Sequence, residues 1–161
     1  MHWEAVIAFP KMKVGVVTRD GFVAGIRYLP LSADSKAPEN ELAERAARQI
    51  ERYREDPDAK FDLPLLIEGS DFQRRVWDAM CAIPRGRTLT YGEMARKLDG
   101  DARVVGQACG DNRLPIVIPC HRVVAAAGIG GFGHSTGGFL LEAKRWLLMH
   151  EASADSFQLR S

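Results

Sequence analysis

Closely spaced helix breakers in the second half of the chain restrict its fold more than any other feature of the sequence. Ser70 is suited to cap a helix that the run 83–87, Ile-Pro-Arg-Gly-Arg, brings to an end. Two shorter helices are then predicted over residues 91–98 and 102–109, with Asp99-Gly100 between them. Two short helices joined by a tight glycine-containing turn form a candidate helix-turn-helix, although many helical cores share this pattern.

The first half of the chain has the pattern of a small β-sheet followed by one helix. Residues 5–29 are rich in β-forming side chains, and Thr18-Arg19-Asp20-Gly21 carries the signal of a hairpin turn. Apolar side chains then recur at helical spacing over residues 39–55, and Asp56-Pro57-Asp58 ends that helix. The pattern predicts strands first and a single amphipathic helix after them.

Length and composition fit two small globular domains. The chain has 161 residues, of which 46% are hydrophobic and 27% charged, enough apolar material for a core without disulfides or metals. We expect the α+β class, with antiparallel strands plus a helix over residues 1–69 and a mostly helical domain over residues 70–161. Because the net charge is only +1, nucleic-acid binding would require positive charge concentrated on one face.

The three cysteines, Cys81, Cys109 and Cys120, contain no Cys-x-x-Cys pair, so they predict neither a disulfide framework nor a zinc site. Cys81 and Cys109 lie near the ends of predicted helices, where a cysteine usually packs as a small apolar side chain. The first residues lack the pattern of a signal peptide, and no apolar run approaches the ~20 residues that span a bilayer. We therefore expect a cytoplasmic protein that does not enter a membrane.

Cys120 has the sequence surroundings of a nucleophile. It follows the rigid Pro119 and precedes His121 and Arg122, two potential cations that are expected to lower the pKa of its thiol. A Cys-His pair alone is nevertheless more often an accident of packing. If His121 acts as a base, its second nitrogen needs an orienting partner, for which Glu151 is a candidate. From the residues alone, Glu151 is more simply a solvated carboxylate at a helix end.

The run Pro119-Cys120-His121-Arg122-Val123 strongly resembles the active-site motif of the O6-alkylguanine-DNA alkyltransferases, also called methylated-DNA–protein-cysteine methyltransferases. The likeness continues in the same order along the chain. Its further segments are the first helix of the C-terminal domain at 72–77, the start of the helix-turn-helix at 90–95, the recognition helix at 102–106, and the closing loop and helix at 137–138 and 144–151. The resemblance is close over about residues 70–151, whereas the N-terminal region is similar only in outline.

This resemblance implies a winged-helix-like DNA-binding domain and a DNA repair activity. The protein would move the alkyl group of O6-alkylguanine irreversibly to Cys120, acting once per molecule and without cofactor or metal, with O4-alkylthymine as a possible second substrate. Its partner would be double-stranded DNA containing the lesion, bound through the minor groove with the damaged nucleotide flipped out, because O6 is inaccessible inside the duplex. No obligate protein partner is implied.

The resemblance also assigns roles to individual residues. Glu151 would orient His121, which would act through a water on Cys120. Tyr91 would press on the phosphate 3′ to the lesion and donate a hydrogen bond to the departing guanine. Asn112 would hold the turn before the cysteine. Arg103 would fill the gap left by the flipped nucleotide. The other residues assigned are Ala102, Gly106 and Gln73 for DNA contact, and Pro119, Val123, Phe132 and Ser135 for the pocket. Without the resemblance, the simpler interpretations are a solvated cation at Arg103, a core tyrosine at Tyr91 and a helix cap at Asn112.

The sequence departs from the family in the loop over residues 128–136, which is longer and richer in glycine. The tyrosine or serine expected in the pocket has no clear counterpart there, and Phe132, His134 or Ser135 could replace it. We expect a roomier pocket that accepts alkyl groups larger than methyl. Three other functions remain open: a non-catalytic protein that binds alkylated DNA, a winged-helix regulator with a redox-sensing cysteine, and a Cys-His hydrolase or acyltransferase that turns over repeatedly.

Overall fold

The computed structural model describes residues 1–130 and 138–160, with side chains as far as Ala152. The chain divides into two compact units, Met1–Ile67 and Glu68–Ser161. The boundary predicted after Gly69 lies beside this division. The first unit contains an antiparallel sheet with one helix, and the second is mostly helical, so the predicted α+β class is confirmed.

The sheet of the first unit has the strand order β1-β2-β3, formed by Ala5–Ala8, Lys13–Arg19 and Phe22–Leu29. Strands β2 and β3 form a hairpin in which Arg19 pairs with Phe22. Between them, Asp20 and Gly21 have φ angles of 53° and 82°, the left-handed conformation that a two-residue hairpin loop requires. The turn predicted at this place is therefore confirmed.

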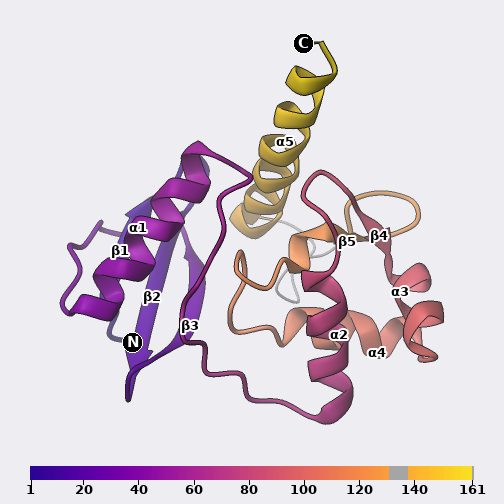
Figure 1. Ribbon diagram of the computed structural model, residues 1–161, viewed down its shortest axis with the longest axis horizontal. Helices are drawn as coiled ribbons and strands as arrows, with labels where there is room; N and C mark the ends of the chain where they lie inside the picture. The colour runs from indigo at the N-terminus through magenta and orange to yellow at the C-terminus, as the bar shows by residue number, and fades with distance from the viewer. Residues whose placement is uncertain (131–137, 161) are drawn as a thin grey trace. The chain divides into compact units, whose positions relative to one another are not determined.

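Helix α1, Glu41–Glu55, packs on this sheet and covers one of its faces (Figure 1). Asn40 caps the helix by accepting a hydrogen bond from the backbone N–H of Ala43. Ala43, Ala46, Ile50 and Tyr53 recur on the buried face and form a core with the apolar side chains of the strands.

In the second unit, α2 (Asp71–Cys81) and α3 (Tyr91–Leu98) begin with the same local device. Ser70 and Thr90 each form a capping box, with Gln73 and Glu93 respectively. These caps explain why the predicted helix starts agree with the structure, since the signal lies within four residues of sequence.

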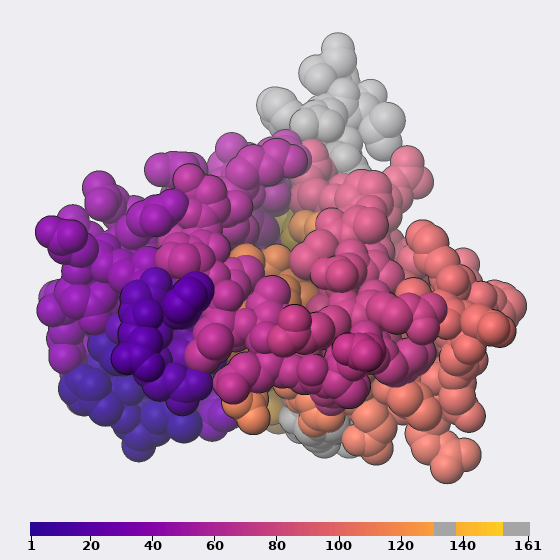
Figure 2. Space-filling view, turned by 60° about the horizontal axis from the view of Figure 1, so that its bottom comes forward, coloured from indigo at the N-terminus to yellow at the C-terminus, as the bar shows by residue number. Residues whose placement is uncertain are grey.

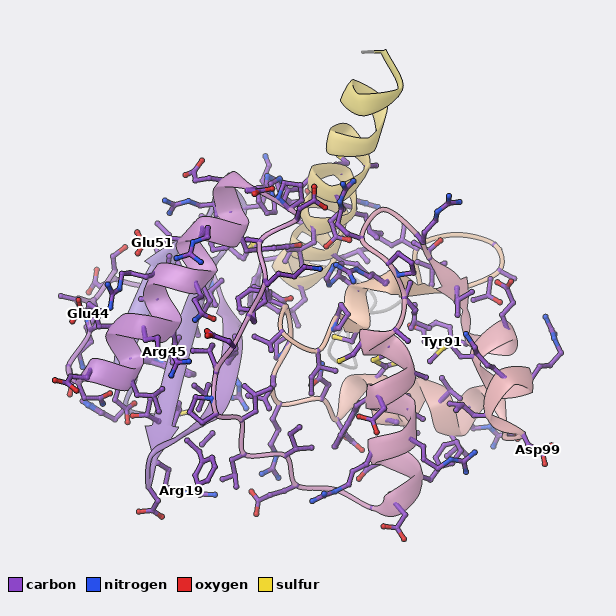
Figure 3. All side chains as sticks on the ribbon, in the orientation of Figure 1. Arg19, Glu44, Arg45, Glu51, Tyr91 and Asp99 are labelled. Atoms are coloured by element: carbon purple, nitrogen blue, oxygen red, sulfur yellow. The ribbon has the colours of Figure 1, made fainter. Side chains whose placement is uncertain are left out.

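Helix α4, Ala102–Gly110, completes the predicted helix-turn-helix. Asp99 ends α3 in the left-handed conformation, with φ of 55°, and its labelled side chain points away from the helices in Figure 3. Asp101 then caps α4 by accepting a hydrogen bond from the N–H of Arg103. The salmon-coloured residues of α3 and α4 form part of the molecular surface in Figure 2.

Three elements near the cysteine motif were not predicted. Cys120–Arg122 form a short 3-10 helix, and the two-residue strands β4 (Leu89–Thr90) and β5 (Val123–Val124) pair in parallel. Strands this short have no periodicity that a sequence pattern can reveal. Their pairing joins the segment after the cysteine to the start of α3.

Helix α5 runs from Gly138 to Arg160 and extends beyond the predicted end at Glu151. Of the helices in the described part of the chain, none combines the length and apolar character needed to cross a bilayer.

Trp77 connects α2 to α4. Its side chain is 5% exposed, and its Nε1 donates a hydrogen bond of 2.8 Å to the backbone carbonyl of Ala108. We expect Trp77→Phe to lower the free energy of unfolding of this unit by about 1–3 kcal/mol, because the buried carbonyl loses its donor. Urea unfolding measures the change, and a loss below about 0.5 kcal/mol would mean that the bond contributes little net stability.

Candidate active site around Cys120

The backbone around Cys120 is held by a turn that Asn112 closes. Asn112 donates from Nδ2 to the carbonyl of Ile118 and accepts at Oδ1 from the N–H of Leu114, both at 2.9 Å. Within this turn Ile116 has a φ of 75°, a strained conformation for a β-branched residue. Asn112 therefore compensates local strain to present Cys120 at a fixed place.

The Cys120 thiol is buried, with the residue 6% exposed. Burial raises the pKa of this thiol to about 11, although a hydrogen bond from Asn112 and the charge of Lys144 act in the opposite direction. The sequence-based expectation of a lowered pKa is wrong, because desolvation outweighs the hydrogen bond from Asn112 and the charge of Lys144. Cys120 is thus a neutral thiol near pH 7, and a reaction at its sulfur requires a base.

His121 has the geometry of such a base. It is fully buried, and its Nε2 lies 2.8 Å from Oε2 of Glu151. A carboxylate only accepts, so Nε2 carries the proton of the neutral ring and Nδ1 keeps its lone pair. Burial lowers the pKa of His121, which favours this neutral form. Nδ1 is buried and has no hydrogen-bond partner among the described residues.

Glu151 is buried as well, with the residue 1% exposed. The interpretation of this residue as a solvated helix-end carboxylate is therefore wrong. Its two oxygens accept from Nε and Nη2 of Arg122 at 3.0 and 3.1 Å, and its backbone carbonyl accepts from Arg85. Arg122, expected beside the thiol, instead forms a two-point ion pair with Glu151.

Tyr91 and Lys144 form a second group close to the cysteine. Tyr91 is the first residue of α3 (Figure 3), and burial is the main cause that raises its pKa to about 12. Lys144 is fully buried on α5, donates to the carbonyl of Val123 at 2.9 Å and lies 5.9 Å from the ring centre of Tyr91. Burial lowers the pKa of Lys144 to about 8. No role was predicted for Lys144 from the sequence, although its position on the apolar face of a predicted helix indicated that it would be buried.

Besides Tyr91 on α3, the residues expected to contact DNA lie on α4 and α2. Ala102 and Arg103 are exposed at the start of α4, and a Cβ atom added to Gly106 would meet no atom within 4 Å. Val104, which the sequence analysis did not single out, is 48% exposed beside them. Gln73 is engaged within the protein, where it caps α2 and donates to Asp111 at 3.1 Å.

Comparison with known proteins identifies the family. Residues 71–153 match the family model described as 6-O-methylguanine DNA methyltransferase, DNA binding domain. A methylated-DNA–protein-cysteine methyltransferase of Methanosarcina acetivorans is 39% identical over 150 residues, covering 87% of this chain and 94% of that protein. One from Mycolicibacterium paratuberculosis is 45% identical over 109 residues, 66% of this chain and 63% of that relative, so the match spans less than two thirds of its length.

The solved structure of the Mycobacterium tuberculosis O6-methylguanine methyltransferase has a TM-score of 0.77 and 32% identity, covering 94% of this chain and 93% of that one. The chain belongs to the methylated-DNA–protein-cysteine methyltransferase family. A structure of the Mycobacterium tuberculosis protein in complex with DNA matches with the same TM-score. Membership in this family links the chain to DNA repair in general terms.

The proposed pocket of this methyltransferase is described only in part. Pro119 is buried and Val123 is fully buried. Phe132, His134 and Ser135 lie outside the described residues, so the roomier pocket stays a prediction. Among the residues that the structure describes, no group of three His, Cys, Asp or Glu side chains is placed to hold a metal ion.

The cysteines of the methyltransferase differ in exposure. Cys81 is exposed, contrary to the expectation that it packs as an apolar side chain, whereas Cys109 is partly buried. We expect iodoacetamide to label Cys81 before Cys120 at pH 7.5, because Cys81 is exposed whereas Cys120 is buried and the pKa of both thiols is raised. Peptide mapping by mass spectrometry measures the order. Faster labelling of Cys120 would contradict the raised pKa, and a Cys120→Ser variant should leave the labelling of Cys81 unchanged.

Proposed function

We propose that this protein repairs DNA by transferring the alkyl group of O6-alkylguanine to the sulfur of Cys120, once per molecule. The observation that carries the proposal is the buried arrangement of a neutral thiol next to His121, whose Nε2 is bound to Glu151 at 2.8 Å. This arrangement provides a nucleophile, a base with a free lone pair and a partner that fixes the orientation of the base.

The reaction is an in-line displacement. The Cys120 proton passes through a water to Nδ1 of His121 while the sulfur forms a bond to the alkyl carbon. The bond between that carbon and O6 breaks, and the guanine leaves with the electron pair. The Tyr91 hydroxyl donates a hydrogen bond to the departing base, which would otherwise leave as an unstabilised anion. Burial raises the pKa of Tyr91 and keeps its hydroxyl protonated, and this state, together with its half-buried position, supports the assignment.

The product limits the protein to a single reaction. An alkyl thioether lacks the carbonyl group that water attacks in an acyl-enzyme, so hydrolysis does not regenerate the thiol. No cofactor is needed, because the substrate itself carries the leaving group. O4-alkylthymine presents the same kind of alkyl–oxygen bond and is a second candidate substrate.

The partner is double-stranded DNA, which the protein would meet in the cytoplasm, with α4 in the minor groove. The damaged nucleotide must leave the base stack to bring its O6 substituent to a buried sulfur. Arg103 fills the resulting gap, because its planar cation can stack on neighbouring bases. The exposure of Ala102 and Arg103 and the open space at Gly106 support a close approach of α4 to DNA.

Intact mass spectrometry tests the proposed transfer. After incubation with an oligonucleotide that contains O6-methylguanine, we expect the protein to gain one methyl group, and peptide mapping to place it on Cys120. The Cys120→Ala variant is the control and should gain none. Unchanged mass of the original protein despite tight binding of the lesion would support a non-catalytic binding protein instead.

Alkylation should also destabilise the protein. The sulfur lies in a close-packed site, with Cys120 6% exposed and Val123 fully buried, so an added methyl group must displace its neighbours. We expect a loss of about 1–3 kcal/mol in the free energy of unfolding and a lower melting temperature. Thermal unfolding of the protein before and after reaction measures the difference, and an unchanged or higher melting temperature would contradict it.

A further inference from the structure

We propose that Arg122 is a positioning residue for this reaction: by keeping Glu151 ionised, it holds Nδ1 of His121 free to accept the Cys120 proton. The inference deepens the proposed function and rests on alkyl transfer at Cys120. Arg122 touches neither the sulfur nor the base nitrogen in this arrangement. It acts through the carboxylate that lies between it and the imidazole.

The contacts of Arg122 are directed at Glu151 and at the backbone beside it. Nε and Nη2 donate to the two carboxylate oxygens at 3.0 and 3.1 Å, and Nη1 donates to the carbonyl of Ile83 at 2.7 Å. The guanidinium is 13% exposed and the carboxylate 2%, so water screens the pair weakly. This two-point geometry fixes the plane of the carboxylate and aims Oε2 at Nε2 of His121.

Within the group of Arg122, Glu151 and His121, the charges balance only when Arg122 is present. A positive Arg122, a negative Glu151 and a neutral His121 sum to zero. Without the guanidinium, the buried carboxylate would lose its two-point ion pair, and weakening the pairing of a buried charge is costly. The pair of Glu151 and His121 would therefore take up a proton.

Either position of that extra proton disables the base. If it resides on the imidazole, Nδ1 is protonated and cannot accept. If it resides on Glu151, the carboxylic acid donates to Nε2, and the single ring proton moves to Nδ1. Both arrangements leave Nδ1 protonated, so the loss of Arg122 should suppress proton acceptance near neutral pH whichever group holds the charge.

Other charged groups around His121 also contribute to its titration. Lys144 on α5 and Arg122 oppose protonation of the imidazole, whereas Glu151 favours it. Arg85, from the segment after α2, donates to the backbone carbonyl of Glu151. The Cys120 thiol stays neutral below its raised pKa of about 11. Arg122 bonds directly to both oxygens of the carboxylate that sets the His121 proton.

A histidine titration tests the inference without relying on activity. The full chain is labelled with isotopic histidine, and NMR follows the four ring signals against pH, with His121→Gln identifying the signal of His121. In Arg122→Met we expect His121 to titrate about one pH unit or more above its position in the original protein. Arg122→Lys keeps the charge and should fall between the two. An unchanged titration in Arg122→Met would overturn the proposal.

Glu151→Gln gives a second test with the opposite sign. Removing the anion leaves Arg122 unopposed beside the ring, so His121 should titrate at lower pH than in the original protein. If Arg122→Met does not fold, Arg122→Lys keeps the proposal testable, because losing the two-point contact should still raise the pH at which His121 titrates. Arg145→Met is the matched control, because Arg145 pairs with Glu142 on the surface of α5. It should leave the titration of His121 unchanged.

The rate of methyl transfer from a saturating O6-methylguanine oligonucleotide provides the functional readout. In the original protein the rate should fall only below pH ~6.5, the ordinary pKa of histidine, because burial lowers the pKa of His121. In Arg122→Met the pH below which the rate falls should rise by about as much as the pH at which His121 titrates. An equal loss at every pH would make Arg122 merely structural and overturn the proposal. If the original protein transfers no methyl group, the proposed function fails, while the titration still decides the role of Arg122.

Discussion

The unit that contains Cys120 depends on the interactions of the buried Glu151 carboxylate. The carboxylate oxygens of Glu151 accept hydrogen bonds from His121 and Arg122, and the backbone carbonyl of the same residue accepts one from Arg85. These contacts join α5 to the 3-10 helix of the cysteine and to the segment that follows α2. An ionised carboxylate is retained in a protein interior only when its oxygens are paired, so all three segments must be correctly placed together.

This constraint explains why the nucleophile is kept in a neutral form. A thiolate in so buried a site would be a further charge removed from water, and burial raises the pKa of Cys120 accordingly. In the proposed reaction, reactivity then depends on proton transfer to His121 and not on a permanently ionised sulfur. The same burial limits access of small electrophiles to the thiol.

The turn before Cys120 is held by contacts between residues that are close in the chain, although one of these residues has an unfavourable backbone conformation. Ile116 adopts a left-handed φ of 75°, and the side chain of Asn112 bonds to the backbone on both sides of it. Strain of this kind persists only where the surroundings compensate for it. The pairing of β4 with β5 then ties the segment after the cysteine to the start of α3, from which Tyr91 projects.

The sequence alone determined the features that depend on near neighbours in the chain. The start of α3 follows from Thr90 and Glu93, the hairpin turn follows from Asp20 and Gly21, and the cysteine motif is a continuous run. Tertiary structure decided the direction of the Cys120 pKa shift, the burial of Glu151 and Lys144, and the direction in which Arg122 points. These properties depend on desolvation and on partners 29 to 66 residues away, such as the pairs of Glu151 with Arg122 and Arg85. Family resemblance suggested Glu151 as the partner of His121. Only the folded chain removes these two side chains from water, and their burial sets the charge state of each.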